Sequence, residues 1–153
     1  MAEESSPAIE KRVQRWLKGE IGTAELYQLT PDLIQSIADY GYLLYEQGKY
    51  ETAKTIFEAL TAIDSGNSHF QKILGSIYQL QEKWDAAYYR YSQSLRTVPT
   101  DVFVITNRGE VLLKLQRRKE AIEDFKQAIL LDPEHRNPTS RRARVLLEGL
   151  QAG

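Results

Sequence analysis

The chain has 153 residues, 42% of them hydrophobic, and its 20 Lys and Arg against 21 Asp and Glu leave a formal charge of -1. This balance creates no global field that would attract nucleic acid or an anionic membrane, so we expect partners of neither kind. The absence of cysteine excludes disulfides and thiol chemistry. A polar, acidic start and the lack of a long apolar run predict a cytoplasmic protein.

The first 30 residues form a predicted helical extension. Ser6 and Pro7 are typical of a helix start, and the residues that follow place an apolar stripe on one helical face. The stripe consists of Ile9, Val13, Trp16 and Leu17. It must be buried either on the chain's own repeats or against a second copy in a homodimer, and both alternatives stay open at this point.

A period of 34 residues dominates residues 31–135. Glycines recur at 41, 75 and 109, alanines at 53, 87 and 121, and aromatic residues at 57, 91 and 125. The period divides the region into three blocks, 34–67, 68–101 and 102–135. Each block shows helical spacing of apolar residues in both halves, so each is predicted to be a leading and a trailing amphipathic helix.

Local signals mark the ends of these helices. Thr30 before Pro31 predicts a helix over 31–47, and Gly48 can adopt the left-handed conformation that closes it. The later blocks have no glycine at their internal turns, near 81–83 and 116–118, so these turns are expected to depend on packing. Pro99 and Pro133 should end the trailing helices before them.

Residues 136–153 predict one last amphipathic helix that caps the array. Asn137 and Pro138 signal its start, and Ala143, Leu146, Leu147 and Leu150 share one face. Arg141, Arg142 and Arg144 are expected on its solvated side. An RNA-binding role for this arginine run is a weaker alternative.

The repeated positions resemble the tetratricopeptide repeat. The third block carries the pattern most fully, in Gly109, Leu112, Ala121, Phe125 and Pro133. The resemblance implies an all-α, right-handed superhelix of three helix-turn-helix repeats, flanked here by the N-terminal extension and the capping helix. In such packing the small residue admits the neighbouring helix and the aromatic residue fills the gap between helix pairs.

A narrower resemblance covers roughly residues 22–91. The segments Gly22-Thr23-Ala24-Glu25-Leu26, Thr30-Pro31 and Tyr45-Glu46-Gln47-Gly48-Lys49-Tyr50-Glu51-Thr52-Ala53 are similar to class II chaperones of bacterial type III secretion. That resemblance implies a cytosolic protein, commonly dimeric through its N-terminal region, that holds a secreted translocator subunit in its groove. The alternative is a general adaptor that assembles subunits of another protein complex.

The repeat register also predicts a peptide-binding groove. Leading helices line the concave surface of such arrays, and their positions outside the core should face a partner. These are Gln35, Ala38, Tyr42, Tyr45, His69, Lys72, Ser76, Gln79, Phe103, Thr106, Glu110 and Leu113. Tyr42, Tyr45, Phe103 and Leu113 are candidate pockets for the side chains of an extended peptide. The two tyrosines could instead pack on the N-terminal extension or a dimer mate.

No catalytic constellation is predicted. The two histidines, His69 and His135, lie in different repeats and neither has a second ligand at metal spacing. Glu120, Glu123 and Asp124 are expected on an exposed helical face. We therefore expect a binding protein, not an enzyme, with no metal and no cofactor.

Overall fold

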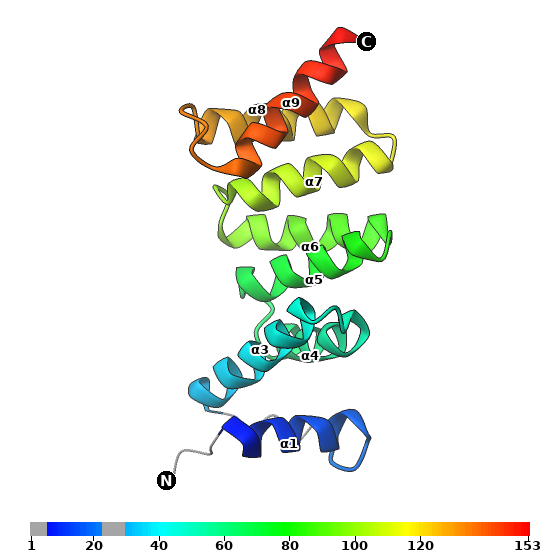
Figure 1. Cartoon of the computed structure of the whole chain (residues 1–153), viewed down its shortest axis with the longest axis vertical. Coiled ribbons are helices and arrows are strands. Elements are labelled where there is room, and N and C mark those ends of the chain that lie inside the picture. The colour runs from blue at the N-terminus through cyan, green and yellow to red at the C-terminus, as the bar shows by residue number, and fades with distance from the viewer. Residues whose placement is uncertain (1–5, 23–29) are drawn as a thin grey trace. The chain divides into compact units, whose positions relative to one another are not determined.

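The computed structural model describes residues 6–22 and 30–153, and within these ranges it contains eight α-helices and no strand. The helices are α1 (Ser6–Leu17), α3 (Pro31–Glu46), α4 (Tyr50–Ile63), α5 (Ser68–Leu80), α6 (Trp84–Thr97), α7 (Val102–Lys114), α8 (Arg118–Leu131) and α9 (Pro138–Ala152) (Figure 1). The segment Gly22-Thr23-Ala24-Glu25-Leu26, which carries part of the narrower resemblance, lies largely outside the described residues. The fold is all-α, as predicted.

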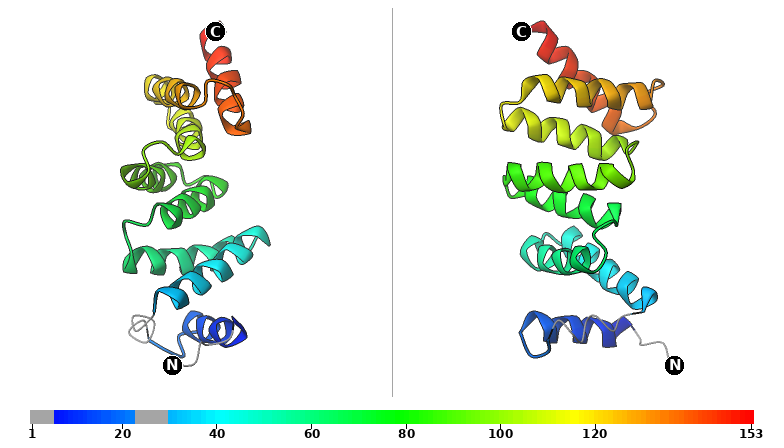
Figure 2. Two further views of the ribbon diagram at one scale, coloured as in Figure 1. Left: turned by 90° about the vertical axis from the view of Figure 1, so that its left-hand side faces the viewer. Right: turned by 180° about the vertical axis from the view of Figure 1, so that it is seen from behind.

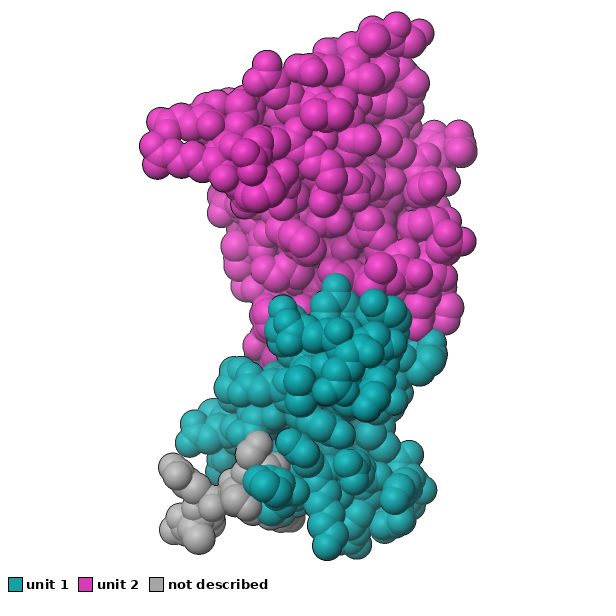
Figure 3. All heavy atoms as spheres, viewed as in Figure 1, with its two compact units in different colours: residues 1–65 teal, residues 66–153 magenta. Residues whose placement is uncertain are grey.

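Two compact units divide the chain. Unit 1 comprises residues 1–65, with α1, α3 and α4, and unit 2 comprises residues 66–153, with α5 to α9 (Figure 3). In unit 2 the leading helices α5 and α7 lie on one side together with α9, and the trailing helices α6 and α8 lie on the other (Figure 2, left). None of the helices that the structure describes is long and apolar enough to cross a membrane.

Side-chain caps start the leading helices. Thr30 and Asn137 cap α3 and α9 as predicted, each accepting a hydrogen bond from a backbone N–H of the first turn. Asn67 and Asp101, which are 34 residues apart, do the same for α5 and α7. Each cap accepts a hydrogen bond from an N–H group that has no partner within the helix. The cap therefore fixes where the helix begins.

The turn inside each block closes in the same way, whether or not glycine is present. Gly48, Glu82 and Gln116 have φ values of 76°, 57° and 61°. The residue after each donates its N–H to a carbonyl five residues earlier, the hydrogen bond of a Schellman closure. The prediction that the two later turns depend on packing alone is therefore wrong, because they retain the local closure without glycine.

Glycine and aromatic residue pair within every block. A Cβ atom on Gly41 would lie 3.1 Å from the ring of Phe57, and one on Gly109 would lie 2.6 Å from the ring of Phe125. These rings and that of Tyr91 are fully buried. The close approach confirms the prediction that the small residue admits the neighbouring helix and that the aromatic residue fills the space beside it.

Two terminal helices complete the units. In unit 2, α9 packs on α7 and α8 and buries Ala143 against the cluster around Phe125, as its apolar face predicts. In unit 1, α1 packs on α3.

One charged residue departs from expectation. Asp124 is buried and paired with Arg108 instead of lying on an exposed face.

Candidate functional site

The predicted groove residues of unit 1 all lie on α3. Ala38 is buried, whereas Gln35 is exposed and donates its side-chain amide to Asp39 at 2.8 Å. Tyr42 is 40% exposed, and Tyr45 is half-buried. Three of the four residues are therefore accessible to a partner.

An aromatic cluster extends the exposed part of α3. The rings of Tyr42 and Tyr45 stack with centroids 6.0 Å apart, and Tyr45 meets Tyr50 of α4 at 5.7 Å. Leu43 beside them is 45% exposed. The sequence register named two of these four residues, and the other two come from neighbouring positions that the register assigned to no surface. The three tyrosine rings contact one another in series and offer aromatic surface to another apolar side chain.

The predicted groove residues of unit 2 lie on α5 and α7. His69 and Phe103 are exposed, while Lys72, Gln79, Glu110 and Leu113 are half-buried. Ser76 and Thr106 are buried, so a partner would reach them only after displacing their neighbours.

Side-chain length explains which of these positions reach the surface. Ala38, Lys72 and Thr106 share one register position, and only the lysine extends beyond the helices that cover it. Ser76 is likewise buried at the position where Tyr42 and Glu110 are accessible. The register therefore predicts the direction of a side chain, and its length decides its exposure.

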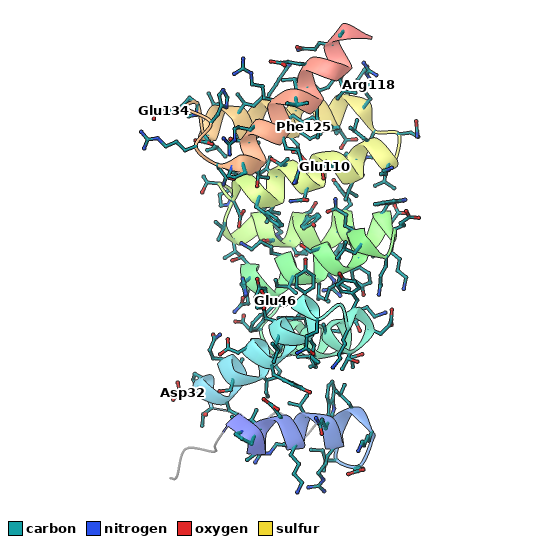
Figure 4. All side chains as sticks on the ribbon, viewed as in Figure 1. Asp32, Glu46, Glu110, Arg118, Phe125 and Glu134 are labelled. Carbon is teal, nitrogen blue, oxygen red and sulfur yellow. The ribbon has the colours of Figure 1, made fainter. Side chains whose placement is uncertain are left out.

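A hydrogen-bonded chain of polar groups crosses the leading helices of unit 2. The Tyr91 hydroxyl donates to Gln79 Oε1 at 2.6 Å, and Gln79 Nε2 donates to Glu110 Oε2 at 3.3 Å. Arg142 of α9 then pairs its Nε with Glu110 Oε1 at 2.6 Å and donates from Nη2 to Asn107 Oδ1 at 3.2 Å. Glu110 lies on α7, opposite the first turns of α9 (Figure 4). The chain links α6, α5, α7 and α9.

Sequence reasoning did not place Arg142 beside a predicted groove residue, Glu110. Arg142 was expected simply on the solvated side of α9, and its side chain is indeed 46% exposed, but it reaches back to α7. The repeat register could not have found it. The residue 34 positions earlier is Arg108, which turns toward α8 and pairs with Asp124.

A second ion pair joins α5 to the start of α7. Lys72 Nζ is 2.8 Å from Asp101 Oδ2 and 5.9 Å from the centre of the Phe103 ring. Asp101 also caps α7 through its other oxygen, so one carboxylate fixes both the helix start and the lysine. The predicted groove side of unit 2 thus combines neutralised charge with an exposed aromatic ring.

The N-terminal stripe is only partly available to a second copy of the chain. Ile9 and Val13 are buried within the single chain, whereas Trp16 and Leu17 are half-buried. The first two residues thus already have their packing partners.

These groups suit binding better than catalysis. The aromatic rings, amides and paired charges offer apolar contact and hydrogen bonds to a peptide. Among the residues that the structure describes, no group of three His, Asp or Glu side chains could hold a metal ion.

Two segments of the chain match a known repeat family, and about half of the chain aligns with a curated relative. Residues 34–67 and 103–135 match the tetratricopeptide repeat family. The low calcium response locus protein H of Yersinia pestis is 31% identical over 80 residues, which cover 52% of this chain and 48% of that relative. The alignment thus spans about half the length of the curated relative.

Two solved structures share the fold over most of the chain. One is the type III secretion chaperone SycD of Yersinia enterocolitica in complex with a peptide of the translocator YopD. Its sequence is 26% identical and its TM-score is 0.75. The match covers 80% of this chain and 95% of the SycD chain. PcrH of Pseudomonas aeruginosa is 25% identical with a TM-score of 0.73 and covers the same shares of the two chains. These matches identify the chain as a tetratricopeptide-repeat protein that resembles the translocator chaperones of type III secretion systems.

Proposed function

We propose that this chain is a non-catalytic, cytoplasmic chaperone of a type III secretion system. It would hold an extended apolar segment of a secreted translocator subunit against its leading helices until export. The observation that carries the proposal is the similarity to SycD, whose solved structure holds a peptide of the translocator YopD. That similarity reaches well beyond the two segments that match the repeat family.

The surfaces of both units suit an apolar segment. Tyr42 in unit 1 and Phe103 in unit 2 are exposed aromatic residues on leading helices. In unit 2 the nearby charges of Lys72 and Glu110 already have partners. Covering a paired charge costs less than covering an isolated one, so an apolar side chain can settle beside these residues. Burial of the apolar surface of these rings would contribute about 25 cal/mol to the binding free energy for each Å² removed from water.

A homodimer would use the part of the N-terminal stripe that the chain leaves accessible. Trp16 and Leu17 are half-buried on α1, and a second copy could cover both. We propose these two residues as the dimer contact, and their replacement by alanine should shift the mass measured by light scattering toward that of the monomer.

Co-expression tests the chaperone function directly. Secreted proteins with long apolar stretches from the same genome would be produced with this chain, or with a tetratricopeptide-repeat protein of unrelated function as the control. The expected result is that one such protein becomes soluble and co-purifies only with this chain. If every apolar candidate stays insoluble while the chain co-purifies with subunits that are soluble on their own, the adaptor function is correct instead.

A further inference from the structure

The near-zero net charge of the chain hides a strong asymmetry between its two units. Residues 1–65 contain 6 Lys and Arg against 11 Asp and Glu, whereas residues 66–153 contain 14 against 10. Unit 1 is therefore acidic and unit 2 basic. A basic surface favours acidic ligands, both in the rate of encounter and in the choice between competing partners.

Several cations of unit 2 are committed to internal partners. Arg108 is held by Asp124, and Arg117, the residue before α8, is held by Glu120 of that helix. Lys72 pairs with the cap residue Asp101. These charges stabilise the unit and have little capacity left for a ligand.

Arg142 differs because it is both oriented and accessible. Its guanidinium uses Nε for Glu110 and Nη2 for Asn107, yet the side chain is 46% exposed. A guanidinium carries five N–H donors, so these two contacts leave three of them for a ligand. Glu110 is itself held by Gln79. The guanidinium is thus positioned before a ligand arrives, which reduces the entropy lost on binding.

We propose that Arg142 binds an acidic side chain of the segment held by unit 2. This inference rests on the proposed function, and it specifies the partner as a segment that combines apolar residues with an Asp or Glu. Arginine and carboxylate can form two parallel hydrogen bonds, a geometry that selects carboxylate over a neutral amide. The net positive charge of unit 2 acts in the same direction.

A random library of 12-residue peptides displayed on phage tests the inference with the full-length protein. Selection on the wild-type chain should enrich peptides that carry an Asp or Glu at a fixed spacing from apolar residues. Synthetic copies with this acid should bind about 10-fold more tightly than copies with the matching amide, the ratio expected from a charged hydrogen bond of modest strength. The difference should shrink at high salt.

Two variants of α9 assign the preference to one residue. Arg142→Gln should reduce the acid-to-amide ratio to less than about 2-fold, while Arg144→Gln should leave it unchanged. Arg144 is a suitable control because it lies on the same helix and pairs only with Glu148 among the described contacts. Circular dichroism checks folding, and Arg142→Lys, which lacks the planar pair of donors, replaces Arg142→Gln if that variant does not fold.

The outcomes separate the inference from the function on which it rests. Enriched peptides without an acidic preference on the wild-type chain, or a preference that survives in the Arg142 variants, would overturn the inference and leave the chaperone function standing. Failure to enrich any peptide would count against the binding function itself, and the inference would fail with it.

Discussion

The guanidinium of Arg108 on α7 donates two parallel hydrogen bonds to the carboxylate of Asp124 on α8, at 2.8 and 2.7 Å. Both side chains are largely buried, and the carboxylate holds the pKa of Arg108 above its ordinary value. The Ser92 hydroxyl of α6 accepts a further hydrogen bond from the guanidinium. One arginine therefore joins three helices across two successive blocks.

Removing one partner of this pair should destabilise the protein. We expect Asp124→Asn to lower the free energy of unfolding by about 1–3 kcal/mol, because a largely buried guanidinium would lose its counterion. Urea unfolding of Asp124→Asn, Arg108→Gln and the double variant measures the coupling. A double variant as unstable as the sum of the two single variants would show that the residues do not interact.

Glycine is required where the helices of the second block meet. A Cβ atom on Gly75 would lie 2.5 Å from Cδ1 of Tyr91, whose ring is fully buried. Gly75→Ala should therefore destabilise the chain by about 1–3 kcal/mol, although alanine is the better helix former. Thermal and urea unfolding measure the change.

Gly149 provides the matched control for this substitution. It lies in α9, and apart from the neighbouring residues and backbone of its own helix no atom would come within 4 Å of its Cβ. Gly149→Ala should stabilise the protein by about 0.5–1 kcal/mol through helix propensity alone. Equal effects of the two substitutions would contradict the close approach of helix and ring in the second block.

The fold could be predicted from the sequence because its determinants are local and repeated. The spacing of Gly75 and Tyr91 recurs in the other two blocks, and each copy specifies the same helix pair. The similarity to SycD and PcrH confirms the family that those positions indicated. Agreement between propensity, capping and packing makes such a pattern informative.

The candidate site was harder to predict because it depends on contacts that do not repeat. Arg142 shares its register with Arg108, yet its guanidinium pairs with Glu110 of α7, whereas that of Arg108 pairs with Asp124 of α8. Thr106 was expected to line the groove and is fully buried. Neither outcome follows from the period, since both depend on the length and the neighbours of single side chains.

The left-handed residues Glu82 and Gln116 offer two stabilising substitutions. Their φ values of 57° and 61° are unfavourable for a residue with a Cβ atom, and the equivalent residue of the first block is Gly48. Glu82→Gly and Gln116→Gly should each raise the free energy of unfolding by about 0.5–1 kcal/mol, after allowance for the extra freedom of glycine in the unfolded chain. The reciprocal change, Gly48→Ala, should lower it. If the two changes to glycine lowered the free energy of unfolding and Gly48→Ala raised it, these turns would not share one conformation.

Acid should weaken the connection between α8 and α9 through Asp132. A hydrogen bond from the Ser140 hydroxyl, followed by those from the N–H groups of Asn137 and Arg136, lowers the pKa of Asp132. A carboxyl with a lowered pKa in the folded state stabilises the fold above its unfolded pKa of about 3.9. That contribution is lost as the pH falls from this value through the folded pKa.

Comparison with Asp132→Asn over a pH series isolates this effect. The variant should be less stable than the wild-type chain at pH 7, and the difference should narrow as the pH falls below about 4. Urea unfolding at each pH measures it. A difference that stays constant down to pH 3 would mean that ionisation of Asp132 does not contribute.

Phe103 is the sharpest single test of the proposed groove. Phe103 is 37% exposed in the first turn of α7. Such a large apolar side chain at the surface is available to a partner. If it anchors an apolar residue of the partner, Phe103→Ala should weaken binding by at least about 10-fold, which is 1.4 kcal/mol and typical of an interface anchor. The translocator that becomes soluble on co-expression serves as the ligand, with calorimetry as the measurement.

Tyr89→Ala is the control, because Tyr89 is a 54% exposed aromatic residue on the trailing helix α6. Leading and trailing helices lie on opposite sides of unit 2 (Figure 2, left). A ligand that lies along the leading helices should therefore contact Phe103 of α7 and not Tyr89 of α6. We expect Tyr89→Ala to retain wild-type affinity. If it weakens binding as much as Phe103→Ala, the partner lies on the trailing helices, and the groove positions derived from the repeat register are not its site.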